Sequence, residues 1–243
     1  MHSVVDIIER PKLKNPVLIE GLPGTGFVAN IAALHLINEF KAKKFVEIRS
    51  RTFQDLVIST EEGLIRSPVN ELYYHHSGTG NDMIVLYGNT QALTAFGQYE
   101  LCGRILDTAQ EFGCQLVVSM GGLRKDRVVG PPRVYCTATD HDTLNHVLKN
   151  DAEILQGHVT GVAGLLIGLA KLREIHGFCL LAETPGSYPD AAAAKSVLEV
   201  LCKVLGVKVD LERLNIAVKQ TEKILKSFSF MGALQRPEFS VSF

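Results

Sequence analysis

The residues that could do chemistry occur first in a glycine-rich loop, EGLPGTGF, near the start of the chain. Gly21 and Gly26 have the GxxxxG spacing of a phosphate-binding loop, in which a Lys and then a Ser or Thr follow the second glycine. Phe27 and Val28 occupy those two places here. Because the charge and the hydroxyl that hold phosphates and magnesium are missing, we predict that this loop does not bind a nucleoside triphosphate. Two interpretations stay open, a tight strand-to-helix turn and weak anion binding at a helix N-terminus.

A second segment, VVSMGG, is similar to the nucleophile elbow GxSxG around Ser119. Val117 stands where that motif has its first glycine, which relieves crowding at a strained turn. We therefore interpret Ser119 as a strand-end hydroxyl, and we predict no catalytic residue in this chain.

The histidines and cysteines lack the spacing of metal ligands. Adjacent His75 and His76 would point to opposite faces of a strand, and His141 and His146, five positions apart, would not share a helix face. The five cysteines form no CxxC pair, and no HExxH motif occurs. We predict no bound metal and no cofactor.

The polar loop ETPGSY, residues 183–188, follows an apolar segment that we expect to be a strand. Ligands of α/β proteins bind at the carboxyl ends of such strands, so the loop is a candidate ligand contact. The alternative is a strand exit followed by a helix cap. Together with the two glycine segments, the loop defines a candidate ligand pocket formed by Gly24, Thr25, Gly26, Gly121, Gly122, Glu183, Thr184, Ser187 and Tyr188.

The composition of the 243 residues restricts the class of protein. A net charge of −1 and a pI near 6.7 do not indicate a nucleic-acid-binding protein. The N-terminal segment is unlike a signal peptide, and the longest apolar segment is shorter than the roughly 20 residues that span a membrane. The cysteines lie mostly in apolar runs, as in a reducing compartment. We expect a cytoplasmic protein that binds neither nucleic acid nor membrane, and a mean hydropathy of +0.13 predicts a homo-oligomer.

The hydrophobic pattern predicts the elements that must position these residues. Strands are expected at residues 17–20, 44–50, 82–87, 115–119, 133–139 and 178–182. Helices are expected at 26–40, 94–112, 140–149, 160–175, 187–205 and 210–228. Apolar strands that alternate with helices indicate a mostly parallel sheet covered on both faces. We therefore predict one three-layer α/β/α domain over residues 1–243, with an antiparallel excursion at residues 50–80.

Three segments together resemble the family of proteasome assembly chaperone 2 and its archaeal and bacterial homologues. They are EGLPGTGFVANIAALHLI, VVSMGG and AETPGSYPDAAAAKSVLEVL, of which the last is the most distinctive. The resemblance implies a nucleoside-phosphorylase-like α/β/α fold without the active site of those enzymes. It also implies a homo-oligomer that binds proteasome α subunits and assists their assembly.

The last residues, about 229–243, form an apolar tail that Pro237 prevents from continuing as a helix. The resemblance implies that some family members dock a tail ending in hydrophobic–Tyr–any between α subunits, whereas Ser242 stands in place of the tyrosine here. The tail has two open fates, packing on its own oligomer or insertion into a partner. Its candidate contact residues are Phe239, Val241, Ser242 and Phe243.

The function expected from these observations is that of an assembly chaperone without catalysis. The alternative is an enzyme or sensor that binds a small anionic or nucleoside-like ligand at the carboxyl ends of the strands.

Overall fold

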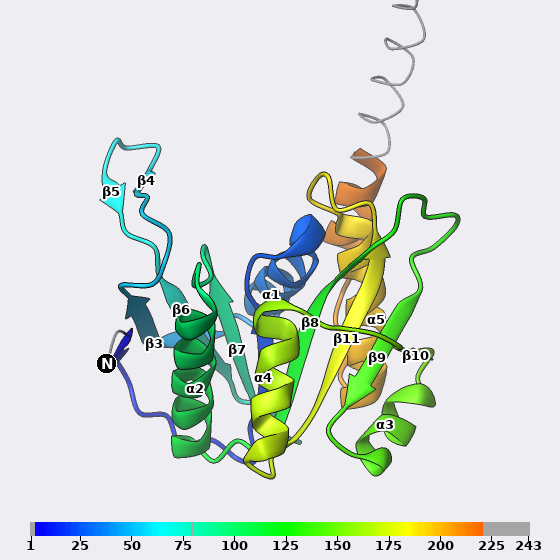
Figure 1. Ribbon diagram of the computed structural model, residues 1–243, viewed down its shortest axis with the longest axis horizontal. Coiled ribbons are helices and arrows are strands. Elements are labelled where there is room, and N and C mark those ends of the chain that lie inside the picture. Colours follow the sequence, from blue (N-terminus) through cyan, green and yellow to red (C-terminus); the bar gives the residue numbers. More distant parts are fainter. Residues whose placement is uncertain (1–2, 79, 221–243) are drawn as a thin grey trace, which may run out of the picture.

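The computed structural model describes residues 3–78 and 80–220, and a sheet of nine strands forms its centre (Figure 1). The strand order is β1-β3-β6-β7-β2-β8-β11-β9-β10. The four central strands are parallel, and they are β7 (Met83–Gly88), β2 (Val17–Gly21), β8 (Leu116–Arg124) and β11 (His176–Thr184). Every residue of β2 is buried, as is typical of a parallel strand covered on both faces.

Other strands extend the parallel centre on both sides. Beyond β7 the sheet continues with three antiparallel strands, β6 (Asn70–His75), β3 (Lys43–Ser50) and β1 (Ser3–Ile7). Beyond β11 lie the antiparallel β9 (Val134–Ala138) and the short β10 (Glu153–Ile154), which is parallel to β9. A separate two-stranded hairpin projects from the body and consists of β4 (Ile58–Ser59) and β5 (Ile65–Arg66) (Figure 1).

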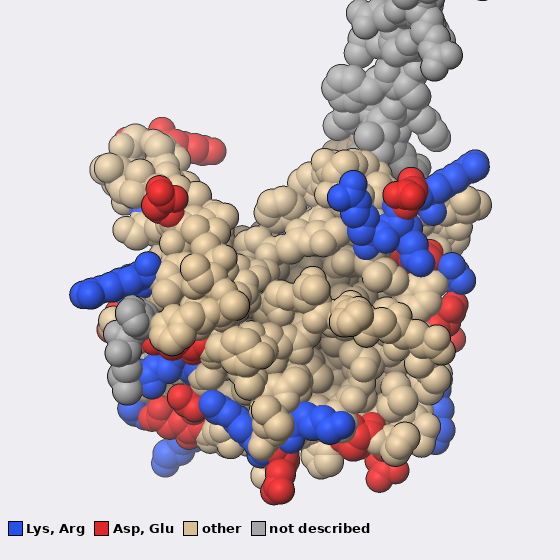
Figure 2. All heavy atoms as spheres, in the orientation of Figure 1, with Lys and Arg blue, Asp and Glu red and all other residues tan. Residues whose placement is uncertain are grey.

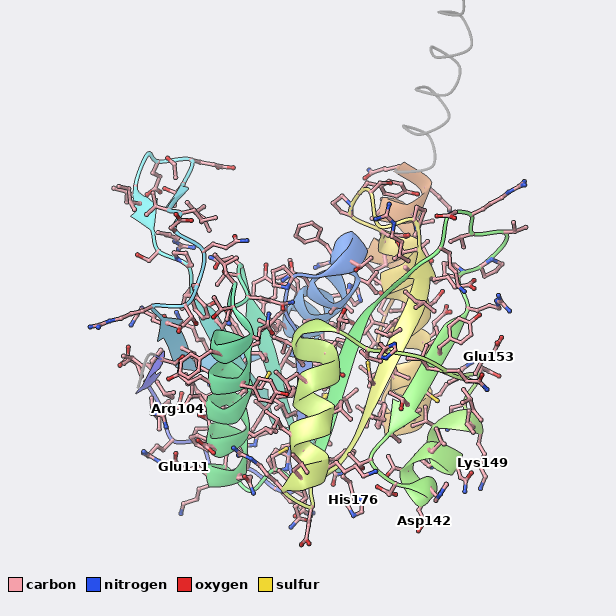
Figure 3. All side chains as sticks on the ribbon, viewed as in Figure 1. Arg104, Glu111, Asp142, Lys149, Glu153 and His176 are labelled. Carbon is pink, nitrogen blue, oxygen red and sulfur yellow. The ribbon has the colours of Figure 1, made fainter. Side chains whose placement is uncertain are left out.

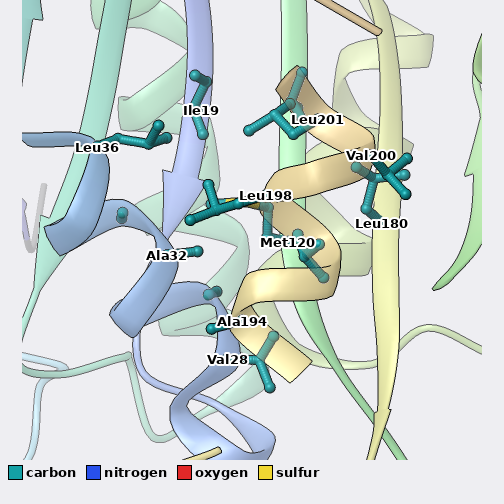
Figure 4. Packing of buried hydrophobic residues seen from close by; sticks show 14 of the residues in the cluster. Ile19, Val28, Ala32, Leu36, Met120, Leu180, Ala194, Leu198, Val200 and Leu201 are labelled. Carbon is teal, nitrogen blue, oxygen red and sulfur yellow. The ribbon is translucent and has the colours of Figure 1, made fainter. Parts of the chain in front are cut away.

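Helices cover both faces of the sheet. One face carries α1 (Val28–Glu39), α5 (Ala191–Leu205) and α3 (His141–Leu148). The other carries α2 (Ala95–Glu111) and α4 (Gly161–Leu172), which stand in front of the sheet in Figure 1. Each face has its own apolar core. In Figure 4, Leu36 of α1 and Leu198 of α5 pack with Ile19 of β2.

Among the helices α1 to α5, three have a hydrogen-bonding side chain at the N-cap, which explains where they begin. Thr94 accepts from the backbone N–H of Gly97, Asp140 from that of Thr143, and Asp190 from that of Ala193. Such a bond satisfies one of the N–H groups that the first turn leaves unpaired. Thr94 and Asp140 lie at starts that the sequence predicted. Asp190 moves the start of α5 to Ala191, after Pro189, whereas the prediction began this helix at residue 187.

The predicted three-layer fold with a mostly parallel central sheet is confirmed, and one strand is longer than expected. β8 does not end at Ser119, as predicted, but continues through Gly121 and Gly122, because its pairing with β11 runs on to Arg124. The strands β1 and β10 were not predicted.

A single domain over residues 1–243 and the likeness to nucleoside phosphorylases stay predictions. No helix of the described residues is long and apolar enough to cross a membrane.

The end of the chain is described only in part. Residues 212–220 are helical, within the helix expected at 210–228. The tail at 229–243, with its candidate contact residues Phe239, Val241, Ser242 and Phe243, lies outside the described residues.

Candidate functional site

A cavity of about 390 Å³ lies at the carboxyl ends of the central strands, where β2 and β8 are neighbours. After β2 the chain continues to β3, which lies on the β7 side of the sheet. After β8 it continues to β9, which lies on the β11 side, so the two connections run in opposite directions. The crevice at such a divergence is where ligands of open α/β sheets bind. In Figure 3, His176 at the start of β11 and Glu111 at the end of α2 lie at the opposite edge of the molecule.

The predicted turn between β2 and α1 forms one wall of this cavity. Gly26 has a φ of 63°, in the left-handed region that favours glycine, and the short 3-10 helix Thr25–Phe27 leads into α1. A Cβ atom on Gly122 of β8 would lie 2.4 Å from the carbonyl oxygen of Thr25. The glycines therefore allow β8 and the turn to approach each other closely.

Glu20 of β2 contributes a carboxylate to the cavity lining and is only 1% exposed. Its Oε1 accepts a hydrogen bond of 2.7 Å from the backbone N–H of Leu22. Its Oε2 has no hydrogen-bond partner in the described part of the chain. Burial raises the pKa of Glu20 to about 7. The N–H of Leu22, which bonds Oε1, and the N–H of Met120, which makes no hydrogen bond with Oε2 in this structure, oppose the rise.

The N-terminus of α4 forms the facing wall, with Thr160, Gly161, Val162 and Ala163 in the lining. Thr160 is the N-cap of α4, and its side chain makes no capping hydrogen bond. The first turn of a helix carries unpaired N–H groups and a partial positive charge. This wall therefore offers hydrogen-bond donors and a positive potential.

Ser119 lies in β8 behind this wall. Its hydroxyl donates a hydrogen bond of 2.7 Å to the carbonyl oxygen of Ala163, which joins β8 to α4. This contact gives the hydroxyl a structural role inside the strand rather than at its end.

The polar loop at residues 183–188 is largely occupied by its own contacts. Glu183 accepts from Arg133 at 2.8 Å and from Tyr135 at 3.0 Å. Burial alone would raise the pKa of Glu183, but these hydrogen bonds hold it below its ordinary value. Thr184 Oγ1 donates to Asp190 at 2.7 Å and accepts from the N–H of Gly186, so the loop joins the end of β11 to the cap of α5.

The structure brings together part of the predicted pocket. Gly24, Thr25, Gly121 and Gly122 line the cavity. The other predicted residues, which are Gly26, Glu183, Thr184, Ser187 and Tyr188, are not among its lining residues.

Sequence reasoning missed Glu20, Gln91 and the start of α4, all of which line the cavity. The sequence did contain a signal for Glu20. It is an acidic residue within the apolar run VLIEG, and acidic residues are rare in buried parallel strands. The described residues contain no group of His, Cys, Asp or Glu side chains that could hold a metal ion.

Comparisons with known proteins match most of this chain. The model of the PAC2 family matches residues 18–229. The chain belongs to the PAC2 family. The predicted resemblance to the proteasome assembly chaperone 2 family is thereby confirmed.

Relatives of this PAC2 protein match it over nearly its entire length. The uncharacterized protein MJ1210 of Methanocaldococcus jannaschii is 36% identical over 233 residues, which are 93% of this chain and 90% of that protein. The crystal structure of Pyrococcus furiosus PbaB, an archaeal proteasome activator, is 36% identical with a TM-score of 0.90, and covers 94% of this chain and 99% of that one. P. furiosus PbaA, an archaeal homologue of proteasome-assembly chaperone, is 25% identical with a TM-score of 0.78, over 94% and 93% of the two chains.

Proposed function

We propose that this PAC2 family protein binds proteasome α subunits and assists their assembly, as a binding protein and not as an enzyme. The observation that carries the proposal is the likeness to PbaB, a proteasome activator, at 36% identity and a TM-score of 0.90. A shared fold alone would not support a shared function. Here the identity extends over 94% of this chain, which includes the loops and helix termini as well as the sheet.

Apolar side chains on the β4–β5 hairpin support a role in protein binding. Val57, Leu64 and Ile65 are 60%, 62% and 72% exposed. Figure 2 shows the hairpin standing clear of the body, and the charged side chains of this face gathered near its margins. Exposed apolar groups on a projecting element are typical of protein–protein contact sites. We propose the hairpin as a contact with another copy of the chain or with an α subunit.

The test is a binding titration between the immobilised full chain and purified proteasome α subunits from the same organism. Saturable binding at micromolar concentration or tighter supports the proposal, and faster formation of α-subunit rings in the presence of the chain supports a role in assembly. Proteasome β subunits from the same organism are the control, because the proposal assigns binding to the α subunits alone. Equal binding to both kinds of subunit, or binding to neither, would contradict the proposal.

A further inference from the structure

The cavity at the ends of β2 and β8 contains a buried acceptor that the protein does not satisfy. Glu20 is buried, and its Oε2 has no hydrogen-bond partner among the described residues, although Oε1 is held by Leu22. A buried polar atom without a partner lowers the stability of the folded protein, because it has lost its hydrogen bonds to water. An unpaired acceptor at the floor of a cavity is explained if a bound molecule donates the missing hydrogen bond.

The wall opposite Glu20 has the complementary chemistry. The N-terminal residues of α4 line the cavity, and no side-chain bond from the N-cap Thr160 serves their N–H groups. In contrast, side chains cap α2, α3 and α5, none of which begins at this cavity. The helix also places its positive end here. A carboxylate or another small anion satisfies such N–H groups.

Between these two walls, the cavity lining is partly apolar and partly polar. Leu22, Val162 and Leu181 contribute apolar side chains to it, and all three belong to the core on the α2 and α4 face of the sheet, whereas the side chain of Met120 packs in the core on the opposite face. A cavity of about 390 Å³ is within the range of small-molecule sites, which is roughly 300–1,000 Å³. A ligand that fits this lining carries an apolar group of moderate size.

We propose that this cavity binds a small α-amino carboxylate with an apolar side chain. Its ammonium group donates to Oε2 of Glu20, its carboxylate accepts from the N–H groups at the start of α4, and its side chain lies among Leu22, Val162 and Leu181. Each end of this zwitterion meets a group of opposite charge. An acid without the amine leaves Glu20 unsatisfied, and an amine without the acid leaves the helix N-terminus unsatisfied. The proposal does not depend on binding to the proteasome.

The ionisation of Glu20 gives the site a pH dependence. An ammonium group pairs with the carboxylate form, so affinity rises as the pH is raised through about 7, the value to which burial brings the pKa of this group. Two thiols lie close enough to sense the charge, Cys102 of α2 and Cys179 of β11, and burial raises the pKa of each to about 12. Both therefore stay protonated throughout. Arg124 and His158 are the other ionisable residues of the lining.

The test is isothermal titration calorimetry of the full chain with three matched probes, L-leucine, 4-methylpentanoate and 3-methylbutylamine. They have the same branched side chain, and the second lacks the amine while the third lacks the carboxylate. We expect L-leucine to bind at least about tenfold more tightly than either truncated probe, which corresponds to about 1.4 kcal/mol. Glycine, L-alanine, L-valine and L-phenylalanine are titrated in parallel to set the preferred side-chain size.

Two variants separate the ends of the site. Glu20→Gln keeps an acceptor for Leu22 but presents an amide NH₂ group to the ligand, so it should abolish the advantage of the amino acid over 4-methylpentanoate. Thr160→Asp supplies a capping carboxylate to α4, so it should raise the melting temperature and weaken binding of the same amino acid at least tenfold. A merely structural role of Thr160 would not move stability and affinity in opposite directions.

The outcomes decide the proposal. Binding of the amino acid that weakens below pH 7, both in the wild type and in His158→Gln, supports it. The proposal is wrong if none of the five amino acids binds below about 10 mM, in which case buried water serves Oε2. It is equally wrong if the truncated probes bind as tightly as L-leucine, or if both variants bind with unchanged affinity.

Discussion

Glu20 places a carboxyl group in the centre of the sheet, where burial favours its neutral form. The pKa rises from 4.5 to about 7, so the folded protein holds this proton more tightly than the unfolded chain does. The contribution of Glu20 to the unfolding free energy is therefore fully present below pH 4.5, decreases as the pH rises, and is lost above about pH 7.

The first prediction compares the wild type with Glu20→Gln across this pH range. Because glutamine does not ionise, the wild type should lose about 3 kcal/mol of unfolding free energy relative to the variant between pH 4.5 and 7. Urea unfolding at several pH values measures the difference. Shifts of other groups, such as Asp82 and Asp140, cancel in the comparison. A difference that is independent of pH would show that burial does not raise the pKa of Glu20.

The second prediction concerns the close approach of β8 to the glycine turn. In Gly122→Ala the new Cβ would lie 2.4 Å from the carbonyl oxygen of Thr25 and 2.6 Å from Cγ2 of Thr184. Backbone must move, so we expect a loss of about 2 kcal/mol of unfolding free energy. Gly168→Ala is the matched control, because Gly168 is exposed in α4 and its Cβ would meet no atom within 4 Å. It should stabilise the helix by up to about 1 kcal/mol. Equal effects of the two substitutions would contradict the close contact.

At the scale of elements, short connections join the strands to the helices that cover them. Asp190 accepts from the hydroxyl of Thr184 at the end of β11 and caps α5 through the N–H of Ala193. The distinctive ETPGSYPD segment therefore serves the junction of β11 and α5. The β4–β5 hairpin does not join a strand to a covering helix, and it presents exposed apolar side chains instead.

The third prediction assigns the hairpin to protein binding. Ile65 is 72% exposed, so Ile65→Asp should change the unfolding free energy of the monomer by less than about 0.5 kcal/mol. The same substitution should weaken self-association or α-subunit binding at least about tenfold, because it places a charge in an apolar contact. Glu62→Ala, on the same hairpin, is the control and should retain both interactions. If Ile65→Asp retains both as well, the hairpin is not a contact site.

At the scale of the whole molecule, we expect self-association. The mean hydropathy of +0.13 and the exposed apolar side chains of the hairpin both favour an oligomer. Light scattering of the full chain should give a mass that is a multiple of 26.6 kDa. A mass of one chain at every concentration would exclude a stable homo-oligomer.

The fifth prediction, after that of self-association, concerns the apolar tail, which lies outside the described residues. Deletion of residues 238–243 should weaken the oligomer or the binding to α subunits, since aromatic side chains such as Phe239 and Phe243 commonly anchor interfaces. Ser242→Tyr restores the hydrophobic–Tyr–any ending and should strengthen α-subunit binding if the tail inserts into a partner. If the truncated chain keeps both its mass in solution and its α-subunit affinity, the tail has neither role.

The sequence alone determined the layers and most of the order of elements. Its information is local: apolar runs mark the central strands, periodic apolar residues mark the helices, and Thr94 and Asp140 stand where two helices begin. The same local signals at Phe27 and Val28 predict that no nucleoside triphosphate binds there, which stays a prediction. They could not show that β8 continues through Gly121 and Gly122, because only pairing with β11 extends that strand.

Only the tertiary structure decided which polar residues meet. Neighbouring parallel strands bring Glu20 of β2 beside Gly121 and Gly122 of β8, although about a hundred positions separate them in the chain. The fold also turns Glu183 toward Arg133 and away from the cavity lining, through an ion pair that no local pattern encodes. The carboxylate that defines the site was present in the sequence, but its burial and its unpaired oxygen arise from packing on both faces of the sheet.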